Sequence, residues 1–254
     1  MKITHAIVKE VSENFSSGLT DATLGKPDLT RAREQHANYV QALKDCGVQI
    51  TVLPADDRFP DSTFVEDPAV VLPDCAILTR PGTPERIEET ALMRDTLTPL
   101  FNTTETIVSP GTLEGGDVLR VDNHVYIGIS ARTNEKGATQ LMEILTRFNV
   151  SSSTVPVQHI LHLKTGCTYM GDNYMLVAGE FVQDPAFTTF DRIVVPDEEA
   201  YAANCLRIND HLIMPKGYPQ TRAQLQKLGL PIIELDMSEF EKQDGSLTCL
   251  SLRF

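Results

Sequence analysis

Five short apolar segments that end in similar ways recur along this 254-residue chain. They end at Pro54, Pro110, Pro156, Pro196 and Asp236, at intervals of 56, 46, 40 and 40 residues. A period of this size is typical of proteins that repeat one small supersecondary unit, which cannot bury its apolar face alone. The repeat therefore restricts the fold more than any single motif does.

Most of these segments are followed by a hairpin pattern, in which two apolar runs flank residues that tolerate a positive φ. The expected turns are Pro73-Asp74, Asp122-Asn123, Gly171 to Asn173 and Asn209-Asp210. Helical periodicity comes next. It covers residues 31–47, 86–97, 132–148 and 221–229, while residues 180–190 predict at most a poor helix.

Each unit thus reads as hairpin, helix and strand, and the fifth unit is split between the two ends of the chain. Its hairpin begins at Cys249 and is completed by "HAIV" at 5–8, before the helix at 31–46. Pairing the last segment with the first would bury two sheet edges. We therefore expect an α/β ring of five units, with residues 1–254 in a single domain. The alternative is an ordinary two-layer α/β protein whose spacing is coincidental.

A ring would bring equivalent positions of its units together at the centre. A polar group follows each apolar segment at a similar place: Glu66 and Asp67, Glu114 and Asp117, His162, Asn204, and Cys249. We expect these side chains, which are far apart in sequence, to converge.

Charge and cysteine usage restrict the partners. The net charge of −13 disfavours nucleic acid and anionic membrane surfaces and favours a cationic ligand. No apolar run is long enough to cross a membrane, and "MKITHAIVKE" lacks a signal-peptide core. The five cysteines include no C-x-x-C pair, which indicates a reducing cytoplasm and argues against a disulfide framework or a thiolate zinc site.

The convergent groups indicate covalent catalysis. A thiolate from Cys249 can act as the nucleophile, His162 can transfer protons near neutral pH, and Glu114 can orient the imidazole. The remaining carboxylates would suppress thiol ionisation unless the substrate is itself a cation. A guanidinium fits best, because it pairs with carboxylates through two N–H···O bonds and carries an electrophilic carbon.

Two arginines supply the opposite charge. Arg86 and Arg132 lie 46 residues apart, each near the start of an expected helix, where the helix dipole is unfavourable for a cation. Binding an anion such as an amino-acid carboxylate would explain them, and solvated surface arginines are the alternative. A guanidinium at one end and a carboxylate at the other describe an arginine-like substrate.

Other candidates have plainer interpretations. His159 and His162, in the strand-like "HILH", have no second pair with which to hold a metal, so we expect no metal site. Cys46, Cys75 and Cys205 fall within apolar patterns and are expected in the core. Cys167 and Asn204 could be structural or belong to the site.

Eight motifs in order carry a resemblance that extends from about Gly18 to Phe254. They are "GLTDATLGKPD", "FPDSTFVEDPAVV", "LTRPGTPERIEE", "LEGGDV", "SARTNEKGA", "LHLKTGC", "YAANCL" and "DGSLTCLSLRF". The chain resembles the dimethylarginine dimethylaminohydrolases, especially their compact bacterial form. The resemblance implies a five-bladed α/β propeller (the pentein fold) and hydrolysis of Nω-methylated arginine to citrulline and a methylamine, without a cofactor.

The resemblance also implies roles for individual residues. Cys249 would attack the guanidinium carbon and form an S-alkylthiouronium, His162 would protonate the departing amine and then activate water, and Glu114 would hold both the guanidinium and the histidine. The implied substrate-binding residues are Leu19 in a covering loop, Asp61, Glu66, Asp67, Arg86, Arg132 and the backbone of Gln243. The sequence departs from bacterial relatives at Gln243, where an apolar residue is usual, and at Cys167.

Three other functions remain open from the sequence. A related enzyme could act on arginine itself, as a deiminase or an amidinotransferase. A ring of this kind could also be a non-catalytic binding module, although such a module would not need Cys249, His162 and Glu114 at its centre. A metal-dependent amidohydrolase is disfavoured by the histidine spacing. Rings of this size commonly pair through an outer face, so a homodimer is the expected assembly.

Overall fold

The computed structural model describes residues 2–254, which form five small three-stranded sheets. In every sheet the middle strand is antiparallel to one neighbour and parallel to the other. The parallel neighbour is reached by a crossover, because parallel strands cannot be joined by a tight turn. The expected unit of hairpin, helix and strand is confirmed.

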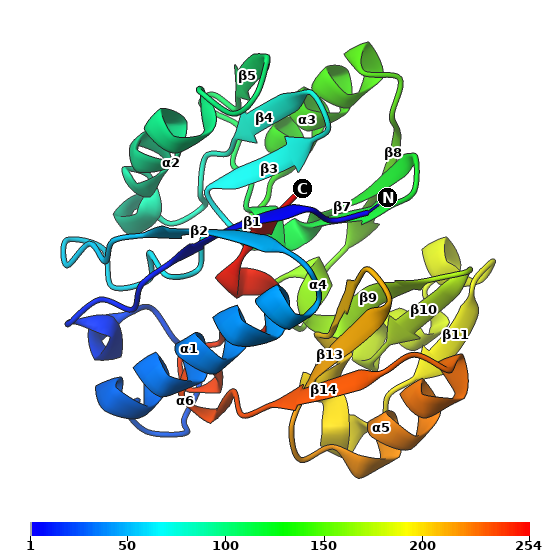
Figure 1. Cartoon of the computed structure of the whole chain (residues 1–254). Helices are drawn as coiled ribbons and strands as arrows, with labels where there is room; N and C mark the ends of the chain where they lie inside the picture. Colours follow the sequence, from blue (N-terminus) through cyan, green and yellow to red (C-terminus); the bar gives the residue numbers. More distant parts are fainter. Residues whose placement is uncertain (1) are drawn as a thin grey trace.

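The five units share this plan (Figure 1). They are numbered here from the N-terminus, so the unit that is split between the two ends of the chain comes first. The first contains β1 (His5–Lys9), α1 (Leu29–Asp45), β2 (Gln49–Leu53) and, from the far end of the chain, β15 (Leu252–Arg253). The second contains β3 (Ala69–Leu72), β4 (Cys75–Leu78), α2 (Glu89–Leu97) and β5 (Thr103–Thr106). The third contains β6 (Val118–Val121), β7 (His124–Ile129), α3 (Glu135–Arg147) and β8 (Ser151–Pro156). The fourth contains α4 (Leu163–Gly166), β9 (Cys167–Gly171), β10 (Tyr174–Val177) and β11 (Asp191–Val194), and the fifth contains β12 (Leu206–Ile208), β13 (His211–Pro215), α5 (Pro219–Leu225), β14 (Ile232–Leu235) and α6 (Ser238–Glu241).

The ring closes where the sequence predicted. β15 pairs with β1 through Ala6–Arg253 and Ile7–Leu252, so the two ends of the chain complete one sheet. Residues of the first strand of every sheet line one central cavity of about 710 Å³. The architecture is therefore the five-bladed α/β propeller that the repeat and the resemblance indicated.

Local sequence explains the helices that cover the outside. Asp28 is the N-cap of α1, and its carboxylate accepts a hydrogen bond from the Arg31 amide at 2.9 Å. Asn134 is the N-cap of α3, and its side chain accepts from the Gly137 amide at 2.8 Å. Both helices bury an apolar stripe between their own sheet and its neighbour. In the fourth unit two short 3₁₀ segments, Gly179–Gln183 and Pro185–Phe187, replace the helix.

Three expectations were wrong in detail. The third strand of the second sheet is Thr103–Thr106 and not the "TIVSP" that ends at Pro110. The final strand is only Leu252–Arg253, and Cys249 lies before it in a 3₁₀ turn, Thr248–Leu250. The "HILH" segment is a bend before α4 and not a strand. In the last two cases the chain leaves the sheet pattern at a residue that points into the central site.

Candidate active site

Cys249 is held at the centre of the ring by contacts on both of its sides. Asn204 accepts from the Thr248 amide and donates to the Thr248 hydroxyl, both at 3.0 Å. The Cys249 carbonyl accepts from the Glu66 amide at 3.2 Å. Asn204 therefore holds Thr248, the residue before Cys249, and is not itself part of the pocket lining.

The Cys249 thiol is neutral at physiological pH. Burial is the largest cause, and the nearby negative charges of Glu66 and Asp67 add to it, so that the pKa of this thiol is raised to about 12. A thiol of this kind is a poor nucleophile until a positive charge comes close to it. The site thus provides a sulfur that requires a cationic partner.

This charge state gives a testable pH dependence. We expect iodoacetamide, an uncharged reagent, to alkylate Cys249 slowly at pH 7, with a rate that rises about tenfold per pH unit up to at least pH 10, because the thiolate fraction grows tenfold per unit below the pKa. Mass spectrometry of the Cys249 peptide would measure it, with the C249S protein as the blank. A rate that levels off near pH 6 would show that the resting group is already a thiolate.

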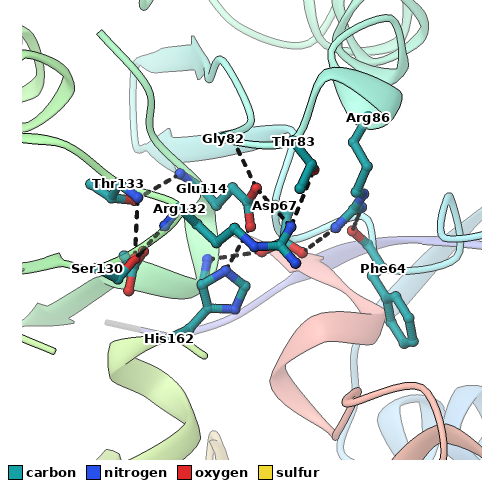
Figure 2. A network of polar contacts seen from close by, with 12 residues as sticks. Phe64, Asp67, Gly82, Thr83, Arg86, Glu114, Ser130, Arg132, Thr133 and His162 are labelled. Atoms are coloured by element: carbon teal, nitrogen blue, oxygen red, sulfur yellow. Dashed lines mark hydrogen bonds and ion pairs between the residues drawn. The ribbon is translucent and has the colours of Figure 1, made fainter. Parts of the chain in front are cut away.

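His162 lies at the bend before α4 and is paired with Glu114. Its Nε2 donates to Glu114 Oε2 at 2.7 Å, and both side chains are buried (Figure 2). Burial by itself would lower the pKa of His162, but the charges of Asp67 and Asp117 and the hydrogen bond to Glu114 raise it to about 9. The imidazole is therefore protonated at neutral pH and ready to act as an acid.

Two glycines allow this pair to approach so closely. A Cβ on Gly116 would lie 2.6 Å from His162 Nδ1, and a Cβ on Gly115 would lie 1.9 Å from the Glu66 carbonyl oxygen. Any side chain at these positions would displace the imidazole or the neighbouring backbone. The physical reason for the Gly-Gly of "LEGGD" is this contact.

Asp67 and Arg86 form a buried network beside the pair. Arg86 Nη1 donates to Asp67 Oδ2 at 2.7 Å (Figure 2). Its Nε and Nη2 bind the Glu89 carboxylate at 3.0 and 2.8 Å. The charges of His162 and Arg86 outweigh burial and lower the pKa of Asp67. Arg86 is thus paired with two carboxylates of the chain and also lines the pocket, where a ligand can reach it.

Arg132 is less fully engaged. Its Nη1 lies 3.1 Å from the Thr83 hydroxyl and 3.6 Å from Glu114 Oε1, and its side chain is partly exposed (Figure 2). Glu114 Oε1 accepts in addition from the Gly82 amide at 3.0 Å. Arg132 therefore combines a position at the pocket with donors that are free to turn toward a ligand.

The pocket contains most of the residues that the sequence selected. Its lining includes Leu19, Asp61, Asp67, Arg86, Glu114, Arg132, His162, Gln243 and Cys249. Segments from both ends and the middle of the chain therefore meet at one point, as the repeat predicted.

Besides Asn204, two predicted residues lie outside this lining. Glu66 forms the floor between the pocket and the central cavity, where Oε1 binds Lys164 Nζ at 2.6 Å and Arg253 Nη2 at 2.9 Å. Asp117 is buried behind His162, accepting from the Leu163 amide at 2.9 Å and from the Ser130 hydroxyl at 2.7 Å. The Glu66 side chain is therefore engaged by two cations of the chain itself.

Within residues 2–254, one cluster has its ligand atoms close enough for a metal. These atoms of Asp67, Glu114 and His162 all lie within 4.8 Å of one another. Each has a hydrogen-bond partner: His162 binds Glu114, and Asp67 accepts from Arg86 and from the Gly116 amide. A protonated imidazole between carboxylates accounts for the cluster without an ion.

Comparison with known proteins agrees with this geometry. Residues 21–252 match the family described as "N,N dimethylarginine dimethylhydrolase, eukaryotic". The N(G),N(G)-dimethylarginine dimethylaminohydrolase of Pseudomonas aeruginosa is 48% identical over 98% of this chain and 99% of its own length. The chain belongs to the dimethylarginine dimethylaminohydrolase family. Hydrolysis of methylated arginine to citrulline is the activity of this family.

Two solved dimethylarginine dimethylaminohydrolases bear on the site. The C249S mutant of the P. aeruginosa enzyme, complexed with citrulline, has a TM-score of 0.99 and 47% identity, and each chain is covered in full. An H162G adduct with S-methyl-L-thiocitrulline has a TM-score of 0.97 and 47% identity, covering 99% of this chain and 100% of the other. In both, the altered residue has the number of a residue that lines the pocket here.

Sequence reasoning missed several residues that shape the site. Lys164 and Arg253 form the cationic side of the floor, Glu89 neutralises Arg86, and Thr83 binds Arg132. Lys164 follows His162 within "LHLK", so its proximity was visible in the sequence. Glu89 lies three residues after Arg86, so the spacing of this pair was visible as well, whereas the partner of Arg253 depends on closure of the ring.

Proposed function

We propose that this protein hydrolyses Nω-methylated L-arginine to L-citrulline and a methylamine, with Cys249 as the nucleophile. The observation that carries the proposal is the charge arrangement of the pocket, in which a neutral thiol and a protonated imidazole face a set of buried carboxylates. This arrangement requires a cation to complete it, and a guanidinium is a planar cation with an electrophilic carbon.

The first half of the reaction forms the covalent intermediate. As the guanidinium enters, its charge offsets Glu66 and Asp67 and lowers the thiol pKa, so the thiol releases its proton to solvent and the thiolate attacks the guanidinium carbon. His162 then donates its proton to the methylated nitrogen. The C–N bond breaks, the amine leaves neutral, and an S-alkylthiouronium remains on Cys249.

The second half reverses the role of His162. The neutral imidazole takes a proton from water, whose oxygen attacks the thiouronium carbon. The C–S bond breaks, the remaining hydroxyl proton passes to the sulfur, the neutral thiol is restored, and citrulline is released. Glu114 stabilises the imidazolium and orients the ring throughout, which is the part an acidic partner has in other nucleophile–base systems.

The substrate is held at both ends. Asp67 and Glu114 bind the guanidinium, and Glu66 contributes through its position beside Asp67. Arg132, together with the edge of Arg86 that lines the pocket, binds the α-carboxylate. Asp61 binds the α-ammonium, with the Leu19 loop and the Gln243 backbone closing over it.

A comparison of substrates tests the proposal. We expect kcat/KM for asymmetric dimethylarginine to exceed that for arginine by at least about tenfold, because a pocket that accepts the N-methyl groups gains their contacts only with the methylated substrate. Citrulline formation and amine release would be measured side by side. Preference for arginine would instead indicate a deiminase, and amidino transfer to added glycine would indicate an amidinotransferase.

Two controls separate the other open functions. Activity that is lost with a chelator and restored by zinc would favour a metal at Asp67, Glu114 and His162. Binding of dimethylarginine without any turnover would favour a non-catalytic binding module.

We also propose that residues 1–254 act as one domain in a cytoplasmic homodimer whose ligand is a small cationic amino acid. The pairing of β1 with β15 supports one domain, because neither end of the chain can complete a sheet alone. All five cysteines are free, which suits a reducing compartment. No helix within residues 2–254 combines the length and apolar character that crossing a membrane requires. Light scattering of the purified protein would test the dimer.

A further inference from the structure

The mouth of the pocket contains two buried oxygen atoms that accept no hydrogen bond. They are Asp61 Oδ1 and Gln243 Oε1, from residues only 5% and 4% exposed. A buried polar atom without a partner is costly, so such atoms commonly mark the place of a ligand. Both residues line the same pocket as Cys249 and His162.

The two oxygens lie close to each other, against the backbone of the covering loop. A Cβ built on Gly18 would lie 2.2 Å from Asp61 Oδ1 and 2.8 Å from Gln243 Oε1, so the backbone of the covering loop passes directly over both. The loop is fastened on either side: the Leu19 amide donates to Asp61 Oδ2 at 3.0 Å, and the Asp21 amide donates to Asp244 Oδ2 at 2.7 Å. A carboxylate oxygen and an amide oxygen therefore lie side by side in the lining of the pocket.

We propose that the side-chain carbonyl of Gln243 accepts a hydrogen bond from the α-ammonium of the substrate and, with Asp61, makes the enzyme selective for free amino acids. An ammonium offers three N–H donors, which suits a carboxylate oxygen and an amide oxygen side by side. An apolar side chain at position 243 would leave only its backbone for such a contact. The inference rests on the proposed function, and it assigns a specificity-determining role to a side chain.

The test uses a pair of substrates that differ only in the ammonium. Dimethylarginine is compared with its des-amino analogue, which keeps the carboxylate and the methylated guanidinium. The quantity measured is the ratio of their kcat/KM values at pH 8, followed by amine release. Gln243→Met, which removes the carbonyl at similar length, is expected to lower this ratio about tenfold, the effect of one hydrogen bond to a charged group.

A second variant distinguishes binding from positioning. Gln243→Glu keeps an acceptor oxygen, so the ratio should stay within about twofold of the wild-type value or rise. If Gln243 instead serves by donating its amide N–H to Asp61, the glutamate would repel Asp61 and lower the ratio as far as methionine does, which would overturn the inference. An unchanged ratio in Gln243→Met would overturn it as well.

Two further measurements keep the inference separate from the proposed function. Gln41→Met, on the exposed face of α1, controls for the substitution itself, and thermal unfolding of each variant shows that it is folded. Failure of the wild-type protein to turn over dimethylarginine would refute the proposed function. The wild-type and variant ratios test Gln243 only.

Discussion

Replacement of Cys249 by serine is expected to abolish turnover of dimethylarginine, with a fall in kcat on the order of 10⁴-fold or more, as when the nucleophile of a covalent enzyme is removed. A serine hydroxyl does not ionise under the influence of a guanidinium, because its proton is far less acidic than that of a thiol. Stopped assays of citrulline over hours would set the upper limit of residual activity.

Binding should survive this change. Asp61, Asp67, Glu114 and Arg132 are untouched in C249S, so calorimetry should give a dissociation constant for dimethylarginine within about tenfold of the wild-type KM. Cys167→Ser is the matched control, because Cys167 is buried in the core and its Sγ donates to the Leu163 carbonyl, a bond that serine can keep. Turnover by C249S, or its loss in the Cys167 variant, would contradict the assignment.

The ring could be predicted because it is written into the chain as a repeat. Apolar segments, turn residues such as Asp122 and Asn209 and a following helix recur together, and only closure pairs the C-terminal strand with β1. Positive φ at both turns confirms the chemistry on which that expectation was based. Position within each unit then brings Glu114, His162 and Cys249 to one pocket.

The sequence did not predict most of the ion pairs that buried charged side chains form around the site. Arg86 pairs with Asp67 as well as with Glu89, and the pairing with Asp67 is set by the packing of η2 (Pro84–Arg86) and α2 against the loop before β3. Glu66 likewise faces Lys164 and Arg253 across the ring. The partners of Glu66 come from other units, and a sequence pattern shows the repeated unit without showing the direction in which a long side chain leaves it.

For two of the site residues, the sequence pattern predicted the wrong secondary structure. The apolar neighbours of Cys249 and His162 predict strands, yet Cys249 lies in the 3₁₀ turn before β15 and His162 lies at the bend before α4. A side chain in a sheet points to one face or the other, whereas a residue outside the sheet can point in another direction. The proposed catalytic positions therefore depart from the local pattern, which is why the pattern misplaces them.

Replacement of His162 by glycine is expected to affect substrates differently, according to whether the leaving group is an amine or a thiol. Turnover of dimethylarginine should fall by about 10³- to 10⁴-fold, since a neutral amine cannot leave without a proton from the imidazolium. S-methyl-L-thiocitrulline, whose leaving thiol needs less help, should still alkylate Cys249, and the adduct should persist because no base activates water. Intact-mass analysis would detect the adduct, and added imidazole should restore part of the hydrolysis.

The same variant reports the charge that His162 carries in the folded protein. Its folded pKa of about 9 lies above the ordinary value of 6.5, so its protonation stabilises the fold fully below pH 6.5, and this contribution is lost as pH rises through about 9. The difference corresponds to about 3 kcal/mol in the free energy of unfolding. Denaturant unfolding of the wild-type protein and of His162→Gly should be measured from pH 6 to pH 10. The difference between their free energies of unfolding should decrease by about this amount as the pH rises. If this difference does not change with pH and His162→Gly still hydrolyses dimethylarginine, His162 is neither the buried cation nor the proton donor, and the mechanism proposed here fails.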